Sequence, residues 1–140
     1  LLDHEIAYLR LRDEDPVHVR ALMLPDALTI PAREDEDGIA RPAETGPVFS
    51  VEPESGTLHM RYTARTKSIE WKRDGAVEAA VAALARVLAT PSPHHHRITL
   101  QAGMGILCNN VLHERAGFVD DEQAPRLLYR ARFYDRVAET

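Results

Sequence analysis

The stretch that decides the predicted fold is Leu100-Gln101-Ala102-Gly103-Met104-Gly105-Ile106-Leu107-Cys108-Asn109-Asn110-Val111-Leu112-His113-Glu114-Arg115-Ala116-Gly117-Phe118, followed by Pro125-Arg126-Leu127-Leu128-Tyr129-Arg130-Ala131-Arg132-Phe133-Tyr134. Two glycines, Gly103 and Gly105, stand where a tight reversal is required, and a short, largely apolar run follows them. We therefore expect a strand, a turn, a second strand, a loop and a third strand that opens at Pro125.

The third of these strands has two faces of opposite character, because successive side chains of a strand point to opposite sides. Its apolar face, expected in the core, carries Leu127, Tyr129, Ala131, Phe133 and Val137. Its cationic face carries Arg126, Leu128, Arg130, Arg132, Tyr134 and Arg136. Arg126 and Arg130 lie roughly 13 Å apart along a strand, so their guanidinium groups can reach the two ends of a small dicarboxylate. A single His, His113, lies on the neighbouring predicted strand, so these residues together could form a site for an anion and a metal ion.

This pattern resembles the C-terminal core of the taurine catabolism dioxygenase (TauD/TfdA) family of Fe(II)- and 2-oxoglutarate-dependent oxygenases. The residues that carry the resemblance are Gly-x-Gly, an apolar strand, Asn-Asn-Val-Leu-His-x-Arg-x-x-Phe and then Arg-x-x-x-Arg. It extends from about residue 46 to residue 137. It implies a mainly β fold with flanking helices (α+β), part of a double-stranded β-helix or jelly roll. Residues 1–140 would then be one domain, the C-terminal portion of a longer enzyme.

The resemblance also implies roles for individual residues. His113 resembles the distal iron ligand of the family, and Arg126 resembles the arginine that pairs with the C5 carboxylate of 2-oxoglutarate. Arg130 resembles its neighbour, which contacts the other end of the cofactor or the substrate. Arg61 and Arg65 are candidates for binding a substrate carboxylate, with ordinary surface charge as the alternative. Asn109 departs from the family pattern, which usually has Asp at this position.

The iron site of the family is a facial triad of two His and one carboxylate, two of them from a His-x-Asp/Glu pair on an earlier strand. None of the seven His residues of this chain has Asp or Glu two positions later. We therefore expect this chain to supply one iron ligand, His113. The portion with the His-x-Asp/Glu pair would lie upstream of Leu1.

The reaction implied by the resemblance uses Fe(II), 2-oxoglutarate and O2. It hydroxylates an unactivated C–H bond of a small metabolite that bears a carboxylate or sulfonate, and it releases succinate and CO2. Two alternatives stay open. One is a non-enzymatic β-sandwich module that binds an anion or a partner through its arginine face; the other is a degenerate domain that has lost iron. A His-x-Asp/Glu strand upstream of Leu1 would favour the enzyme.

The composition of the chain argues against several other classes of function. The chain has 140 residues, of which 44% are hydrophobic, enough for one core. Its formal charge of -5 argues against sequence-independent nucleic-acid binding. It contains no apolar run long enough to span a bilayer and no signal-peptide pattern. A single cysteine, Cys108, fits a reducing, cytoplasmic location and is expected to be buried on a core strand. The formation of a homo-oligomer is left open.

Local signals predict the elements of the first hundred residues. A helix after an Asp3 N-cap would place Leu2, Ile6 and Leu9 on one stripe, and a short helix would span 17–23. The clearest helix, 76–89 after Asp74, should pack against the outside of a sheet. Strands are predicted at 27–31, 39–42, 48–51, 57–62 and 97–101. Turns are predicted at 33–38, 44–47 and 53–56, and the three histidines at 94–96 are expected to lie in an exposed loop.

Overall fold

The computed structural model describes residues 1–35, 38–63, 69–117, 119, 121, 123, 127–133 and 136–137. Within these residues the chain has an α+β fold whose strands pair in antiparallel fashion. The elements, in chain order, are β1 (Leu2–Asp3), α1 (His4–Glu14), α2 (Pro16–Leu22), β2 (Leu28–Ile30), β3 (Arg33–Asp35), β4 (Gly38–Arg41), β5 (Glu44–Gly46), β6 (Phe49–Val51), β7 (Leu58–Met60), β8 (Glu70–Trp71), α3 (Gly75–Ala89) and β9 (Val111–Leu112).

An aspartate stands as the N-cap of each helix. This position favours residues whose short side chain can accept a hydrogen bond from the first helical amides. The side chain of Asp3 accepts a hydrogen bond from the amide of Glu5 at 2.8 Å, which confirms the predicted N-cap of α1. Asp15 caps α2. Pro16 occupies the first helical turn, where its missing amide hydrogen leaves no donor without a partner. Asp74 accepts from the amides of Ala76 and Val77, so α3 begins as the sequence predicts. These caps fix where the helices start.

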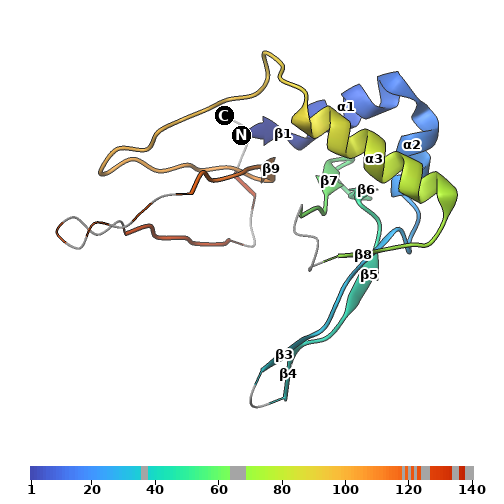
Figure 1. Ribbon diagram of the computed structural model, residues 1–140, viewed down its shortest axis with the longest axis horizontal. Helices are drawn as coiled ribbons and strands as arrows, with labels where there is room; N and C mark the ends of the chain where they lie inside the picture. Colours follow the sequence, from blue (N-terminus) through green and yellow to red (C-terminus); the bar gives the residue numbers. More distant parts are fainter. Residues whose placement is uncertain are drawn as a thin grey trace.

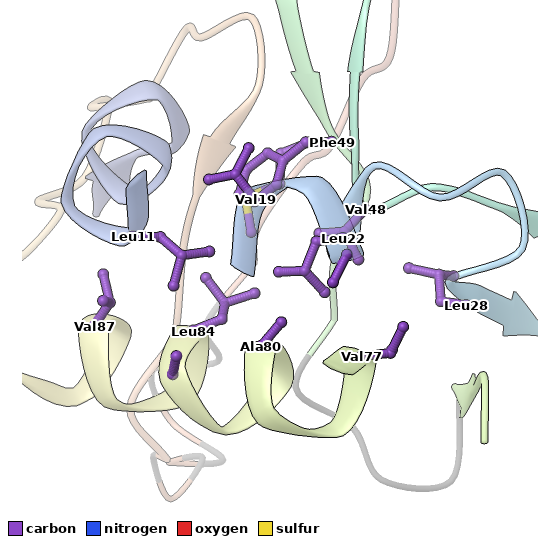
Figure 2. Close-up of a cluster of buried hydrophobic side chains, with 13 residues drawn as sticks. Leu11, Val19, Leu22, Leu28, Val48, Phe49, Val77, Ala80, Leu84 and Val87 are labelled. Atoms are coloured by element: carbon purple, nitrogen blue, oxygen red, sulfur yellow. The ribbon is translucent and has the colours of Figure 1, made fainter. Parts of the chain in front are cut away.

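The core lies between α3 on one side and α1, α2 and the strands that follow them on the other. Figure 2 shows side chains of α3 pointing toward Leu11, Leu22 and Phe49. The ring of Phe49 is fully buried and meets Tyr8 edge to face, with ring centroids 5.3 Å apart. At the rim, Arg86 of α3 forms an ion pair with Glu14 of α1. The three helices therefore enclose the core from two sides.

Two predictions about helix packing are wrong. The α3 helix packs chiefly against α2 and α1 rather than on the outside of a sheet, and its buried face carries Val77, Ala80, Ala83, Leu84 and Val87. The sequence places Val77, Val81, Leu84 and Leu88 on one stripe. Val77 and Leu84 are buried as expected and Val81 and Leu88 are partly buried against the core, while Ala80 and Ala83 also join the buried face. In α1 the buried residues are His4, Ala7 and Leu11, whereas Leu9 is exposed. Helical spacing therefore identifies the core side of α3 but not every residue on it.

The strands of the first half form short hairpins. β2 lies between β5 and β8, and the chain beyond β2 continues as the β3–β4 arm that projects from the body (Figure 1). The predicted turns at 33–38 and 44–47 are wrong where they overlap β3 and β5. Both strands are polar, and pairing across the arm stabilises them rather than burial of alternate residues. Pro31 and Pro42 interrupt the arm, because proline has no amide hydrogen to donate to a ladder.

The last third differs most from its prediction. Residues 97–101 and 127–133 form no strand, and of the predicted strand 106–112 only Val111 and Leu112 pair. Figure 1 shows this part extended to one side of the molecule, away from the helices. Its apolar side chains are exposed, 87% for Tyr129 and 77% for Phe133. The expected core face is therefore uncovered, since the helices pack together elsewhere. Cys108 is also exposed, so its predicted burial is wrong.

The helices of the described part of the chain are short. The longest, α3, has 15 residues. None of them combines the length and the apolar character needed to cross a membrane.

Candidate functional site

The first residues of the chain lie between two segments from its last third. β1 pairs with β9 in antiparallel register, with Leu2 opposite Leu112 and Asp3 opposite Val111. On the other side, the nitrogen of Leu1 donates to the carbonyl of His96 at 2.7 Å, and the amide of His96 donates back to the carbonyl of Leu1 at 2.9 Å. Continuing the β1–β9 register by one residue would set Leu1 opposite His113. The start of the chain therefore reaches the strand that carries the predicted metal ligand.

His113 follows β9 directly, and its side chain is exposed. Its Nδ1 lies 3.0 Å from the carbonyl oxygen of Val111. A carbonyl only accepts hydrogen bonds, so Nδ1 carries the proton and the lone pair of the neutral ring is on Nε2. Metal-bound imidazoles are commonly oriented by such a bond from the ring nitrogen that does not bind the metal. The ring is thus held in a tautomer that suits a metal ligand.

The predicted arginines are placed in different surroundings. Arg130 is exposed in the extended segment 127–133. Arg61 forms an ion pair with Glu44 at 3.1 Å and lies 3.5 Å from the carbonyl of Leu28, beside Gly46. Its guanidinium therefore has protein partners already. Arg126 and Arg65 lie outside the described residues. No hydrogen bond or ion pair joins His113, Arg61 and Arg130 to one another, so their assembly into one site stays a prediction.

Two adjacent asparagines form hydrogen bonds that link the strand leading to His113 to distant parts of the chain. The carboxamide of Asn110 donates to the carbonyl of Met60 at 3.1 Å and lies 3.2 Å from Nδ1 of His59. The side-chain oxygen of Asn109 accepts from the amide of Val137 at 2.8 Å. β9 is therefore linked both to β7 and to the end of the chain.

A pair of histidines lies beside this junction. His4 is the buried polar residue of the described core, and its Nε2 donates to the carbonyl of Leu58 at 2.9 Å. Partial burial lowers the pKa of His59, and the nearby positive groups of His4, Arg136 and Arg61 lower it further. A neutral ring at position 59 also leaves Nδ1 free to accept from Asn110. The neutral form of His59 therefore fits the folded chain.

This shift predicts a pH-dependent stability. Because the pKa of His59 in the folded chain lies below its usual 6.5, its contribution is complete above pH 6.5 and is lost as the pH falls toward the lowered value. The loss should be small, since much of the ring reaches solvent. Urea denaturation at pH 7.5, 6.5 and 5.5 should show a shallower pH dependence in His59→Phe. His94→Phe, a control in the exposed loop, should keep the wild-type dependence; a His59 variant that also keeps it would contradict the assignment.

Two open hollows flank β1 and β9. One, of about 270 Å³, is polar and is lined by Asp3, His4, Glu5, Cys108, Asn109, Asn110, Val111 and Arg136. The other, of about 410 Å³, is more apolar and is lined by Leu1, Leu2, Asp3, Ile6, His94, His96, Ile98, Ile106, Leu107, Cys108 and Val111. Among the residues that the structure describes, no three His, Cys, Asp or Glu side chains lie close enough together to hold a metal ion.

The junction of Asn109, Asn110, His4 and His59 was not among the predicted site residues. The only signal for it in the sequence was the Asn109-Asn110 pair, which stands where the resembled family usually has Asp-Asn. The partners of both asparagines are far away in the chain, 28 residues for Asn109 and about 50 for Asn110. Such contacts leave no local pattern. No protein-family model, curated protein or solved structure matches the chain.

Proposed function

We propose that the chain is the C-terminal part of an Fe(II)- and 2-oxoglutarate-dependent oxygenase with a jelly-roll core. The observation that supports the proposal is the β1–β9 pairing, whose register, continued by one residue, would set Leu1 opposite His113. In antiparallel strands, residues opposite each other share a face. A His-x-Asp/Glu pair on a strand that leads into Leu1 would have both side chains on one face, as its spacing of two requires. Such a strand can present two further ligands beside His113.

His113 fits the role of a ligand because its Nδ1 is held by Val111 and its Nε2 faces no protein partner among the described residues. With the other two ligands it would hold Fe(II) and leave coordination positions for 2-oxoglutarate and O2. The bound iron and 2-oxoglutarate supply the chemistry, in which a C–H bond of the substrate is hydroxylated and succinate and CO2 are released. The protein binds and orients the reactants and limits the access of water.

The arginine-bearing segment gives the cofactor its direction. Arg126 would pair bidentately with the far carboxylate of 2-oxoglutarate, and Arg130 would contact its other end or the substrate. Arg61 and Arg65 would bind the carboxylate or sulfonate of a small metabolite; for Arg61 this requires exchange of its Glu44 partner. The exposed apolar face of Leu127, Tyr129 and Phe133 would be covered by the second sheet of a jelly roll. The location proposed for this enzyme is the cytoplasm.

The test is an anaerobic titration of the protein with Fe(II) and 2-oxoglutarate, followed by the visible charge-transfer band of a chelated 2-oxo acid. Arg126→Ala should raise the 2-oxoglutarate concentration at half-saturation about 10- to 100-fold, because a charge-assisted bidentate pair is lost. Arg132→Ala, in the same segment, is the control and should change it less than twofold. An Arg126 variant with wild-type cofactor dependence would overturn the assignment of Arg126.

A second candidate is a non-enzymatic module that binds a small anion through its arginine face. It is favoured by the absence of a three-ligand cluster among the described residues and by the exposure of Arg130 and Arg132. The same titration separates the two functions. A module of this kind would bind 2-oxoglutarate or succinate equally well with and without Fe(II), and no charge-transfer band would form.

A further inference from the structure

The β6–β7 hairpin leaves one edge of β7 without a partner strand among the described residues. The amide of Arg61 donates to the carbonyl of Val48 at 2.7 Å, so the backbone groups of residue 61 face the side of β6. In an antiparallel pair these groups alternate in direction along each strand. The backbone groups of Met60 therefore face away from β6, and so do those of Leu58, two residues earlier.

Two side chains cover this outer edge of β7 in place of a strand. Nε2 of His4 donates to the carbonyl of Leu58 at 2.9 Å. Nδ2 of Asn110 donates to the carbonyl of Met60 at 3.1 Å. The two contacts link β7 to two other parts of the chain, since His4 opens α1 and Asn110 directly precedes β9.

The contact of Asn110 with Met60 fixes the protonation of a neighbouring ring. A backbone carbonyl only accepts hydrogen bonds, so the group of Asn110 that faces Met60 is the NH2 group. The same nitrogen lies 3.2 Å from Nδ1 of His59. An NH2 group of a carboxamide only donates, so Nδ1 must accept and carries no proton. The ring of His59 is therefore neutral, with its proton on Nε2, when both contacts are made.

Protonation would act differently on the two contacts. A proton on Nδ1 of His59 would place a donor against the NH2 group of Asn110, and the carboxamide would have to turn its oxygen toward the ring. Asn110 would then lose its hydrogen bond to Met60 as well. Both ring nitrogens of His4 already face acceptors, because Nδ1 lies 3.5 Å from the carboxylate of Asp3 and Nε2 faces a carbonyl. A charged His4 ring would keep its contact with β7.

The surroundings of His59 oppose its positive charge. Partial burial lowers the pKa of His59, and the positive groups of His4, Arg136 and Arg61 lower it further. The carboxylate of Glu44 is paired with Arg61 at 3.1 Å, and within the described part of the chain no carboxylate forms an ion pair with His59. The ring is nevertheless exposed, so it exchanges its proton directly with solvent.

We infer that Asn110 is a pH-sensitive latch on the outer edge of β7, which joins β7 to the start of β9 while His59 is neutral and releases Met60 when the ring binds a proton. The contact of His4 persists in both states, so acid opens one of the two links and leaves the other closed. The inference does not depend on the proposed function, because neither Asn110 nor His59 has a role in the oxygenase assignment.

The first test is the affinity of His59 for its proton, followed by NMR of the ring in the full chain. At pH 7.5 the wild-type ring should carry its proton on Nε2. A hydrogen bond made only to the neutral ring must be lost on protonation, so Asn110→Ala should bind the proton about two- to tenfold more tightly. Asn110→Asp should bind it more tightly still, since a carboxylate accepts from the charged ring and attracts it. Gln101→Ala, which truncates an exposed carboxamide, should leave the midpoint unchanged.

Two results of this titration would contradict the latch. One is a wild-type ring with its proton on Nδ1 at pH 7.5, because such a ring cannot accept from Asn110. The other is a midpoint in Asn110→Ala that equals the wild-type value or lies below it.

The second test follows the opening itself. Hydrogen exchange of the Asn110 carboxamide, divided by that of the exposed Gln101 carboxamide in the same sample, cancels the effect of pH on the chemistry of exchange. Between pH 7.5 and 5.0 this ratio should rise about two- to tenfold, with the midpoint of the His59 ring. In His59→Phe the ratio should not change with pH. A constant ratio in the wild-type protein, or an equal rise in His59→Phe, would overturn the role of His59 in opening the latch.

Discussion

Replacing Phe49 with alanine should lower the free energy of unfolding by about 3–5 kcal/mol. The side chain of Phe49 is fully buried between the helices and the β6–β7 hairpin, and its ring meets Tyr8 edge to face. Removing the ring deletes its buried apolar area and leaves a cavity that the surrounding helices cannot close completely. Urea denaturation followed by far-UV circular dichroism measures the loss directly, because α1, α2 and α3 all border this core.

The control for this prediction is Val51→Ala. Val51 lies on the same strand as Phe49 but is 50% exposed, so its truncation should cost about 0.5 kcal/mol or less. Equal losses in the two variants would contradict the description of the core. The contrast would show that the loss comes from the buried position 49 and not from truncating any apolar side chain of β6.

The helices were the most predictable part of this fold because their signals are local. Asp3 and Asp74 begin helices as expected, and Pro16 opens α2. The predicted stripe of α3 also lies on the core side, with Val77 and Leu84 buried; what the sequence did not reveal is that the neighbouring helices cover Ala80 and Ala83 as well. Ala80 and Ala83 face the core because small side chains permit close packing there, a property that no hydrophobic pattern encodes.

The strands were predicted less well because a strand exists only through its partner. β3 and β5 are polar, but β3 pairs with β4 and β5 pairs with β2, and so both count as strands. The reverse holds for residues 127–133, whose alternation of apolar and basic side chains is typical of a strand. The described residues supply no partner and no covering layer for them. An alternation of apolar and polar residues therefore shows that a segment can form a strand, but the strand forms only where a partner strand is available.

The same difference between local and long-range signals applies to the candidate site. His113 was predicted as a metal ligand from a family resemblance carried by residues adjacent in the sequence, and the structure adds the tautomer that Val111 fixes. The links of Asn109 to Val137 and of Asn110 to β7 span 28 and about 50 residues, so only the folded chain reveals them. Arg126 and Arg65 lie outside the described residues, and their roles rest on the family resemblance.

Replacing His113 with alanine should abolish the charge-transfer band and all turnover that depends on 2-oxoglutarate. In the proposed iron site three protein ligands would hold Fe(II), and the loss of one would leave too few to hold it in its open geometry. The imidazole is exposed, and its hydrogen bond within the described part of the chain is to Val111 two residues away, so its removal should change the free energy of unfolding by about 0.5 kcal/mol or less. Anaerobic titration and urea denaturation of the same sample would therefore separate a lost ligand from a lost fold.

His96→Ala is the matched control, because His96 is also exposed and lies beside β1, yet its link to the chain is made by its backbone. It should retain the band at the wild-type Fe(II) concentration. A band that persists in His113→Ala would show that His113 is not a ligand, whatever metal the protein binds. A band lost equally in both variants would point instead to a general disturbance of the β1–β9 region, because His96 bonds to Leu1 of the chain that enters β1 and His113 follows β9.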